Sequence, residues 1–310
     1  MQNEYKEIDL SAWTQVGEGG NGTTYICDQE PGVILKVSHL EDGTLEAVSK
    51  EFYTSKAVYD LGIPTPRMIE IVHVGDEYGI KSQQIGHKLS VGRLCGEHPD
   101  QIDNIAARMA QLGMQIHRTE VQSDKVQDTK KWIPSMKQLM LEALAATRML
   151  SGKKLNEVTA FVEALDDAHT LLHGDFSLGN LIFEMPEDLS SSTLLQKGAF
   201  KPYWIDCGRA VHGIPMFDLG HLYLFCNIFS RTARVQQIAH MTEKQMVQFW
   251  NAFAKAYIHL SPAPVQLSAF EAECKRFAAL DVVLLGHIQT LNWHERLFLS
   301  LLAKSLFKVE

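Results

Sequence analysis

The sequence predicts an α+β fold in which a β-rich N-terminal lobe, residues 1–85, precedes a mostly helical C-terminal lobe, residues 86–310. In the first lobe, short runs rich in β-branched and aromatic residues alternate with Gly and Pro turn signals, which is the pattern of strands and hairpins. In the second, apolar residues recur at helical spacing. A chain of 310 residues is long enough to bury two cores, so we expect two lobes.

A glycine-rich hairpin is predicted near the N-terminus. Residues 11–16 predict a strand, and the next six residues carry Gly17, Gly19, Gly20 and Gly22 in a GxGxxG pattern. Dinucleotide-binding folds use this pattern at the start of a helix, but here the residues that follow predict a second strand. Glycines at a hairpin tip let backbone N–H groups close over phosphates, because no Cβ stands in the way. We therefore expect these four glycines to contact a nucleotide.

Lys36 is the one charge in the apolar strand 33–37, where an unpaired ammonium would be costly. The segment 44–61 has the apolar spacing of a helix, and Glu51 on it is the expected partner, ahead of Glu46. Lys36 paired with Glu51 and reaching the α- and β-phosphates is the arrangement found in kinases. The alternative is that Lys36 extends from an edge strand into solvent.

The polar loop 173–180 carries the clearest signal for chemistry. It places Asp175 and Asn180 five positions apart, and Asp206 comes at the end of a later predicted strand. Phosphoryl transfer from a nucleotide needs one carboxylate to receive the substrate hydroxyl, and an amide plus a second carboxylate to hold magnesium. We predict Asp175 as the catalytic carboxylate, Asn180 and Asp206 as ligands of Mg²⁺, and ATP as the nucleotide, with GTP as an alternative.

Two further groups complete the predicted site. The connector between the lobes falls near Gln83, Gln84 and Ile85, so their backbone groups are expected to meet the adenine edge. His173 heads the polar loop, and we expect it to fix the loop's conformation by hydrogen bonding.

These motifs resemble those of the aminoglycoside phosphotransferase and choline kinase superfamily, the small-molecule branch of the protein-kinase-like fold. The matching features, which span residues 15 to 220, are the glycine loop, Lys36, Glu51, Ile63–Pro66, Gln115–His117, His173–Asn180, Ile205–Arg209 and Phe217–Leu219. The resemblance implies an ATP-dependent phosphotransferase acting on a hydroxyl of a small molecule. It also implies that Asp218 hydrogen-bonds the backbone of the catalytic loop.

Two functions from other classes stay open. A Ser/Thr protein kinase would use the same residues, but no activation segment with an APE-like end follows Asp206. A nucleotide-binding pseudokinase that acts as an interaction module is the other, and the complete set of catalytic residues argues against it.

The composition and net charge of the chain limit the binding partners and the cellular compartment that we expect. A net charge of −8 argues against nucleic acid as the main partner, because binding to its backbone relies on clustered Lys and Arg. The five cysteines are scattered and form no CxxC, which favours a reducing compartment. The N-terminus is too polar for a signal peptide and no apolar run reaches membrane-spanning length. We expect a cytoplasmic protein that does not bind a membrane.

The charge of the last helices bears on the phosphate acceptor. Residues 231–310 hold nine basic and six acidic residues. The acceptor site is expected between the catalytic loop and the helices after Asp218, and a basic excess there would repel a polycationic aminoglycoside. The sequence therefore predicts an acceptor that is not a polycation.

Overall fold

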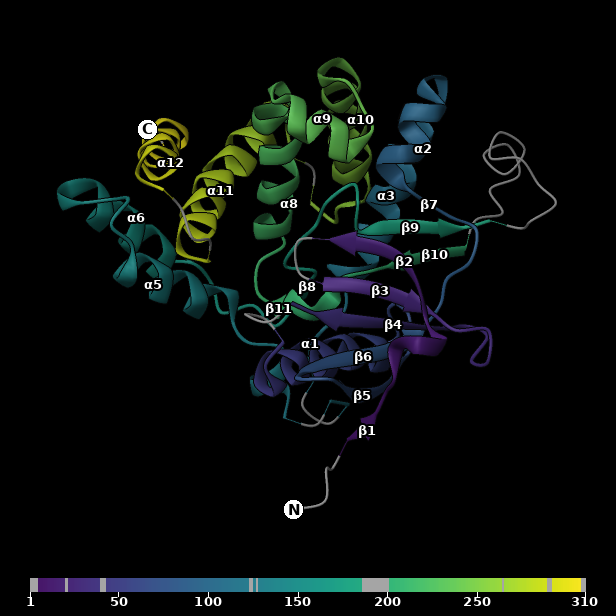
Figure 1. Cartoon of the computed structure of the whole chain (residues 1–310). Coiled ribbons are helices and arrows are strands. Elements are labelled where there is room, and N and C mark those ends of the chain that lie inside the picture. The colour runs from purple at the N-terminus through teal and green to yellow at the C-terminus, as the bar shows by residue number, and fades with distance from the viewer. Residues whose placement is uncertain are drawn as a thin grey trace. The chain divides into compact units, whose positions relative to one another are not determined.

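The structure is a computed structural model that describes residues 5–19, 22–39, 43–122, 125–126, 128–185, 201–263, 265–288 and 292–307. The chain divides into two compact units, Met1–Leu89 with Ile182–Arg209 and Ser90–Leu181 with Ala210–Glu310. The predicted α+β fold, with a β-rich N-terminal part and a helical C-terminal part, is confirmed (Figure 1).

The first unit is built on a six-stranded sheet of order β1-β5-β6-β4-β3-β2. Its strands are β1 (Lys6–Glu7), β2 (Thr14–Gly19), β3 (Gly22–Ile26), β4 (Val33–Ser38), β5 (Met68–Val74) and β6 (Glu77–Gln83). Strands β2 to β6 pair antiparallel with their neighbours, while β1 runs parallel to β5. The predicted glycine-rich hairpin is β2–β3, with Gly19 opposite Gly22.

Helix α1 (Leu45–Asp60) carries Glu51 and packs on this sheet. Thr44 caps its start, since the Thr44 side chain accepts a hydrogen bond from the Ala47 N–H. Val48 and Phe52 of α1 are buried against Ile71 and Ile80 of the sheet. The i, i+4 spacing of the apolar residues therefore fixes which side of α1 meets the sheet.

The segment 182–209 belongs to the first unit by its contacts, although the sequence puts it within residues 86–310. Strands β7 (Lys88–Ser90), β9 (Leu181–Glu184) and β10 (Lys201–Trp204) form a three-stranded sheet of order β10-β9-β7. The Trp204 N–H donates to the Pro64 carbonyl at 2.8 Å, and Ile85, Ile182 and Tyr203 form one buried cluster. Residues 186–200, between β9 and β10, lie outside the described residues.

The second unit is mostly helical. Its α-helices are α2 (Val91–Glu97), α3 (Ile102–Ile116), α4 (Thr129–Trp132), α5 (Met136–Ala146), α6 (Gly152–Glu163), α8 (Met216–Tyr223), α9 (Ala233–Ala239), α10 (Glu243–Leu260), α11 (Leu267–Ile288) and α12 (Trp293–Leu306). A short antiparallel pair joins β8 (Leu171–Leu172), directly before the loop 173–180, to β11 (Val211–His212). Among the described residues, none of the helices has both the length and the apolar character that crossing a membrane requires.

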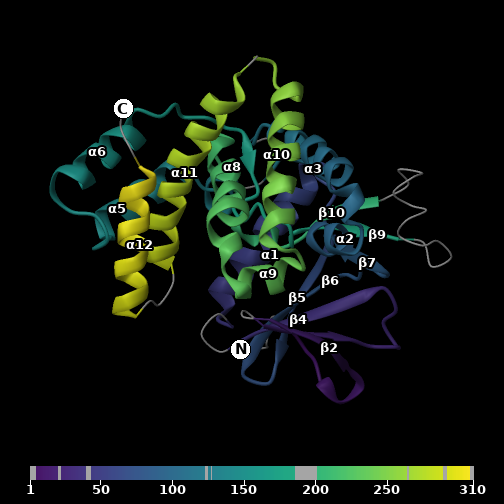
Figure 2. The same ribbon diagram turned by 90° about the horizontal axis from the view of Figure 1, so that it is seen from above.

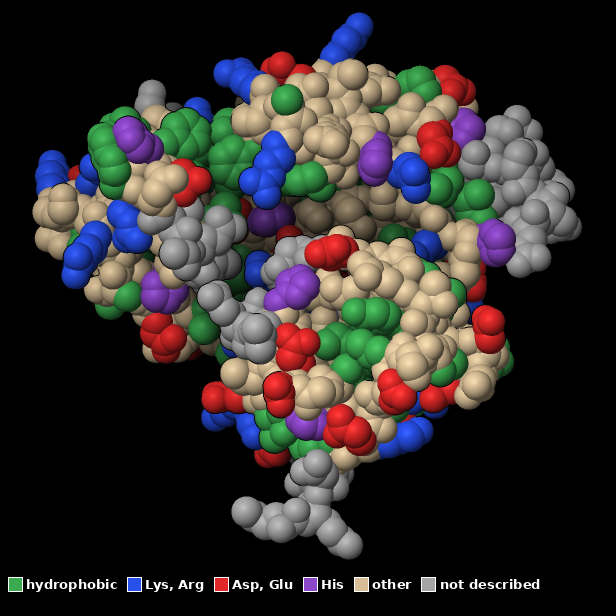
Figure 3. All heavy atoms as spheres, viewed as in Figure 1, with side chains coloured by type: hydrophobic (Ala, Val, Ile, Leu, Met, Phe, Trp, Pro, Cys, Tyr) green, Lys and Arg blue, Asp and Glu red, His purple; other side chains and the backbone are tan. Residues whose placement is uncertain are grey.

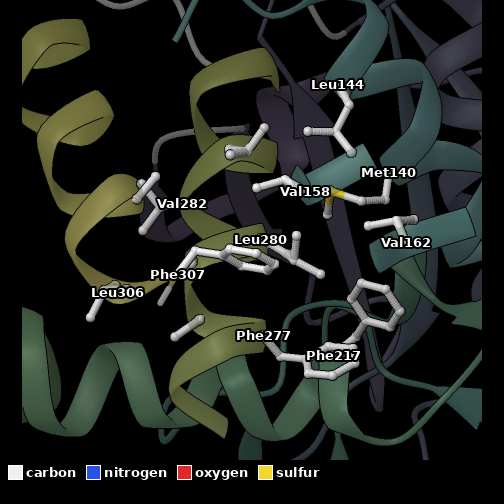
Figure 4. Close-up of a cluster of buried hydrophobic side chains, with 14 of the residues drawn as sticks. Met140, Leu144, Val158, Val162, Phe217, Phe277, Leu280, Val282, Leu306 and Phe307 are labelled. Atoms are coloured by element: carbon white, nitrogen blue, oxygen red, sulfur yellow. The ribbon is translucent and has the colours of Figure 1, made fainter. Parts of the chain in front are cut away.

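The main core of this unit lies where α5, α6, α8, α11 and α12 meet (Figure 4). The rings of Phe217 and Phe277 pack edge to face with centroids 4.9 Å apart. Gly220 lets α8 approach α11 closely, because a Cβ at this position would lie 2.7 Å from the Phe277 backbone carbon. The two helices therefore lie side by side in both ribbon views (Figures 1 and 2).

Helix α12 is apolar on two sides. Leu299, Ala303 and Leu306 belong to the core. The opposite side exposes large hydrophobic side chains over this part of the surface (Figure 3), namely Trp293, Leu297, Phe298 and Leu301.

All five cysteines are free and buried. Cys27 and Cys207 lie in the first unit and Cys95, Cys226 and Cys274 in the second. Burial raises the pKa of the Cys207 thiol to about 12. Burial also raises the pKa of the thiols of Cys95, Cys226 and Cys274.

The close contact between α3 and Phe176 yields a test of the packing. A Cβ at Gly113 would lie 2.6 Å from Cζ of Phe176, which is fully buried. Gly113→Ala gains helix propensity of about 1 kcal/mol but overpacks the core at a cost of about 1–3 kcal/mol. We expect a net loss of unfolding free energy in urea denaturation. The matched control is Gly86→Ala, because a Cβ there meets nothing within 4 Å. A Gly113→Ala protein more stable than wild type would contradict this packing.

Candidate active site

Lys36 and Glu51 form the ion pair of the first unit. Lys36 lies on β4, and its Nζ donates to Oε1 of Glu51 on α1 at 2.8 Å. The two side chains are 26% and 31% exposed, so the ammonium is partly shielded from water and retains open surface for a ligand. Lys36 thus pairs with Glu51 and not with Glu46.

The glycines of the β2–β3 hairpin also serve packing within the sheet. A Cβ at Gly22 would lie 2.5 Å from the Val37 carbonyl oxygen, and one at Gly17 would lie 2.7 Å from Oγ1 of Thr24. Strand β3 can therefore approach β4 closely only with glycine at position 22. Gly20 lies outside the described residues.

Asp206 follows β10 and has a left-handed backbone, with φ of 56°. Asp tolerates this conformation better than most residues, and here it leaves the carboxylate exposed. Gly208, two residues on, packs against α1, because a Cβ there would lie 2.7 Å from Cγ of Glu51. Burial lowers the pKa of Lys88, and attraction to Asp206 opposes this shift. Asp206 belongs to the same unit as the Lys36–Glu51 pair, because residues 182–209 group with residues 1–89.

The predicted adenine-contacting residues already use part of their backbone. The Gln83 N–H donates to the Arg67 carbonyl and the Gln84 N–H to the Gly32 carbonyl, both at 2.9 Å. Ile85 is buried in its hydrophobic cluster. The backbone N–H groups of Gln83 and Gln84 are therefore already bonded within the first unit.

The loop 173–180 of the second unit is held by a buried carboxylate. Both Oδ atoms of Asp218 accept backbone hydrogen bonds, from the His173 N–H at 2.7 Å and from the Gly174 N–H at 3.0 Å. Gly174 has a φ of 77°, a conformation that favours glycine. The side chains of Phe176 and Leu178 are fully buried and anchor the same loop in the hydrophobic interior.

Asp218 in turn belongs to a buried chain of hydrogen-bonding groups. His117 Nε2 lies 3.1 Å from Oδ2 of Asp218, and the Tyr257 hydroxyl lies 2.7 Å from His117 Nδ1. Burial alone would raise the pKa of Asp218, but the hydrogen bond and charge of His117 and the His173 contacts lower it below its ordinary value. Asp218 is therefore an ionised group inside the protein.

Short contacts within the loop orient Asn180 and His173. The Asn180 Nδ2 donates to the Asp175 carbonyl oxygen at 2.8 Å, and the Asp175 N–H donates to His173 Nδ1 at 3.3 Å. With its amide nitrogen used in this way, Asn180 turns its Oδ1 away from the Asp175 carbonyl. An amide oxygen is a suitable ligand for a hard cation.

The side chain of Asp175 contacts a histidine that the sequence did not single out. His221 Nε2 on α8 lies 3.2 Å from Oδ1 of Asp175, and His221 Nδ1 lies 2.9 Å from Oδ2 of Asp281 on α11. Burial alone would lower the pKa of His221, but the two carboxylates raise it well above the ordinary value of 6.5. No motif marks this arrangement, because it joins residues 46 and 60 positions apart on the loop and two helices.

Among the described residues, no group of three or more His, Cys, Asp and Glu side chains could hold a metal ion. A magnesium site would therefore depend on an amide oxygen and on nucleotide phosphates besides a carboxylate. Asn180 and Asp206 supply that kind of oxygen.

Residues 12–250 match the model of the APH phosphotransferase enzyme family. The chain belongs to this phosphotransferase family. A curated relative, acyl-CoA dehydrogenase family member 11 of Pongo abelii, is 22% identical over 218 residues, which are 65% of this chain and 25% of the relative. The chain thus spans about a quarter of that relative's length.

Solved structures of small-molecule kinases share the fold. A thermostable mutant of aminoglycoside phosphotransferase APH(4)-Ia, in a ternary complex with ADP and hygromycin B, aligns with a TM-score of 0.58 and 15% identity over 96% of this chain and 93% of that one. Aminoglycoside-3′-phosphotransferase of type VIII aligns with a TM-score of 0.54 and 17% identity over 86% and 94% of the two chains. A microcompartment-associated aminopropanol kinase aligns with a TM-score of 0.50 and 14% identity over 98% and 92%.

The buried carboxylate yields a prediction for stability and its pH dependence. Asp218→Asn should lower the unfolding free energy by about 3 kcal/mol or more, because it removes the buried charged acceptor of the His173 and Gly174 N–H groups. Since the pKa of Asp218 is lowered from 3.8, its contribution is complete above pH 3.8 and is lost as the pH falls through the native value. The difference between variant and wild type should therefore shrink only in acid.

Urea denaturation at a series of pH values measures this difference. The control is Asp76→Asn, since Asp76 is an exposed carboxylate in the turn between β5 and β6. A difference that stays constant down to acid pH would show that the charge of Asp218 contributes nothing.

Proposed function

We propose that this chain is an ATP-dependent phosphotransferase that moves the γ-phosphoryl group to a hydroxyl of a small molecule. The observation that carries the proposal is the catalytic loop, in which Asp218 holds the backbone of His173 and Gly174 while the Asp175 side chain remains 32% exposed. The family match supports the transfer of a phosphoryl group. The nucleotide and the acceptor are part of the proposal.

Asp175 is the proposed catalytic carboxylate. As the acceptor oxygen forms its bond to the γ-phosphorus, the bond to the β-phosphate oxygen breaks and ADP leaves with that electron pair. The hydroxyl proton passes to a carboxylate oxygen of Asp175. The loop's two backbone bonds to Asp218 keep this carboxylate in place for the transfer.

Lys36, Glu51 and the glycines are the proposed nucleotide-binding residues. Glu51 directs the Lys36 ammonium, which would neutralise charge on the α- and β-phosphates. Gly17, Gly19, Gly20 and Gly22 would allow backbone N–H groups near these phosphates. The backbone at 83–85 would meet the adenine.

Asn180 and Asp206 would hold magnesium. Both provide hard oxygen ligands, and the exposed carboxylate of Asp206 brings a full charge to the cation. When bound, the cation would neutralise charge on the phosphates of the nucleotide. The hydrogen bond from Asn180 to the Asp175 carbonyl would couple the position of this ligand to the catalytic loop.

The proposed acceptor is neutral or anionic. Residues 231–310, which include α9 to α12, have three more basic than acidic residues, and this excess would disfavour a polycation. Several similar solved structures are aminoglycoside phosphotransferases, but at such low sequence identity they support a shared fold and do not indicate the substrate.

The expectation of a cytoplasmic protein stays a prediction.

Release of ADP tests the function. The protein is incubated with MgATP and a panel of sugars, amino alcohols, nucleosides, hydroxy acids and aminoglycosides. We expect turnover with a neutral or anionic acceptor, and a fall of about 10²–10⁴-fold in kcat for Asp175→Asn, which keeps the shape but removes the base. Dedicated turnover of kanamycin-like compounds would overturn the charge argument. Full turnover in a folded Asp175→Asn protein would overturn the role of Asp175.

Calorimetry of nucleotide binding, with and without Mg²⁺, tests the metal ligands. Asp206→Ala should remove most of the magnesium-dependent gain in ATP affinity, and Asn180→Ala should remove less, because an amide carries no charge. Asp76→Ala, which also deletes an exposed carboxylate of the first unit, is the control. An unchanged metal dependence in Asp206→Ala would rule out Asp206 as a ligand.

A further inference from the structure

The further inference concerns His221, which lies between two carboxylates. Its Nε2 is 3.2 Å from Oδ1 of Asp175 and its Nδ1 is 2.9 Å from Oδ2 of Asp281. Ionised carboxylates only accept hydrogen bonds, whereas a neutral imidazole has one N–H to donate. Both contacts are satisfied together only by an imidazolium, which donates from both ring nitrogens. With both carboxylates ionised, this geometry therefore favours an imidazolium next to Asp175.

The packing of α8 on α11 builds this arrangement. Gly220 precedes His221, and a Cβ at this position would lie within 2.8 Å of the backbone of Phe277 and Ala278. This close approach brings His221 of α8 to Asp281, which lies one turn of α11 beyond Phe277. The side chains of His221 and Asp281 are 19% and 13% exposed, so solvent screens the pair only in part.

Several other charged groups on the same elements contact residues other than His221, and Lys275 is a further charged residue of α11. On α11, Glu271 accepts from the Trp250 indole at 3.2 Å, and Arg276 donates to Glu273 at 3.0 Å. On α8, Asp218 is paired with His117. The pKa of His221 is accordingly governed, besides burial, by Asp281 and Asp175.

We propose that His221 is a positioning residue for Asp175: its imidazolium, oriented by Asp281, binds Oδ1 of Asp175 and assigns the acceptor hydroxyl to the second oxygen, Oδ2. This role rests on the proposed function, since it acts through the carboxylate that receives the hydroxyl proton. Binding at Oδ1 restricts the rotamers of the Asp175 side chain. The acceptor hydroxyl, bound to Oδ2, is then directed toward the γ-phosphorus along one line of approach. Asp281 orients the imidazolium without itself touching the acceptor.

The first test does not depend on activity. In protein labelled with ¹⁵N-histidine, NMR should show both ring nitrogens of His221 protonated at neutral pH, with a titration midpoint above 6.5. His221→Gln identifies the resonance by its loss. Asp281→Asn should lower the midpoint by about 1 pH unit or more. Glu273→Gln, which removes a charge from the same helix, should leave it unchanged. A neutral His221 at pH 7, or a midpoint that Asp281→Asn does not move, overturns the inference.

The second test uses kcat as a function of pH, with an acceptor found in the ADP-release panel. Asp281→Asn should move the alkaline limb of the profile to lower pH by the same interval as the NMR midpoint. His221→Ala should lose about ten-fold or more in kcat. His221→Gln should recover part of this loss, because the Gln amide can still donate to Asp175.

The two tests separate the failure of the inference from the failure of the proposed function. Absence of ADP release with every acceptor, in a protein whose His221 titrates as expected, overturns the proposed function. Equal activity in His221→Gln and His221→Ala, or an alkaline limb that Asp281→Asn leaves in place, overturns the positioning role.

Discussion

The second unit depends on the burial of one ionised carboxylate. Asp218 is almost inaccessible to solvent, and it stays ionised because two backbone N–H groups and His117 compensate for the lost hydration. These same contacts fix the start of the loop 173–180. Because α8 carries Asp218 and, three residues later, His221, one helix fixes both the backbone of the loop and the side chain of Asp175.

A comparable constraint acts in the first unit. The close packing of Gly208 against Glu51 couples the turn after β10 to the helix that supports Lys36. A side chain at position 208 would press on Glu51, which pairs with the lysine. Gly208 is thus required by its close packing against α1, and this requirement does not depend on any bound ligand.

Local patterns predicted several of the helices and strands and one ion pair of the candidate site. The hairpin and the helix that carries Glu51 follow from periodicity and turn residues, because these signals act over a few positions. The Lys36–Glu51 pairing could be predicted because a charge in an apolar strand needs a partner. The role of Asp218 was inferred from a resemblance, and its two backbone bonds are visible only in the structure.

The rest could not be predicted because it depends on tertiary contacts between distant residues. His221 and Asp281 look like ordinary polar positions on two helices, and only the close approach at Gly220 joins them. The membership of 182–209 in the first unit likewise arises from pairing with β7 and from the bond to Pro64.

The buried cysteines make it possible to measure local unfolding separately in each unit. A thiol reacts as the thiolate, so a cysteine that is enclosed and has a raised pKa reacts with alkylating reagents only after the surrounding structure opens. Cys207 reports on the first unit, and Cys226 and Cys274 report on the second. The alkylation rates of these thiols, followed separately by mass spectrometry, therefore measure the local stability of each unit in the unmodified protein. Added nucleotide would slow the alkylation of those thiols whose surroundings it stabilises.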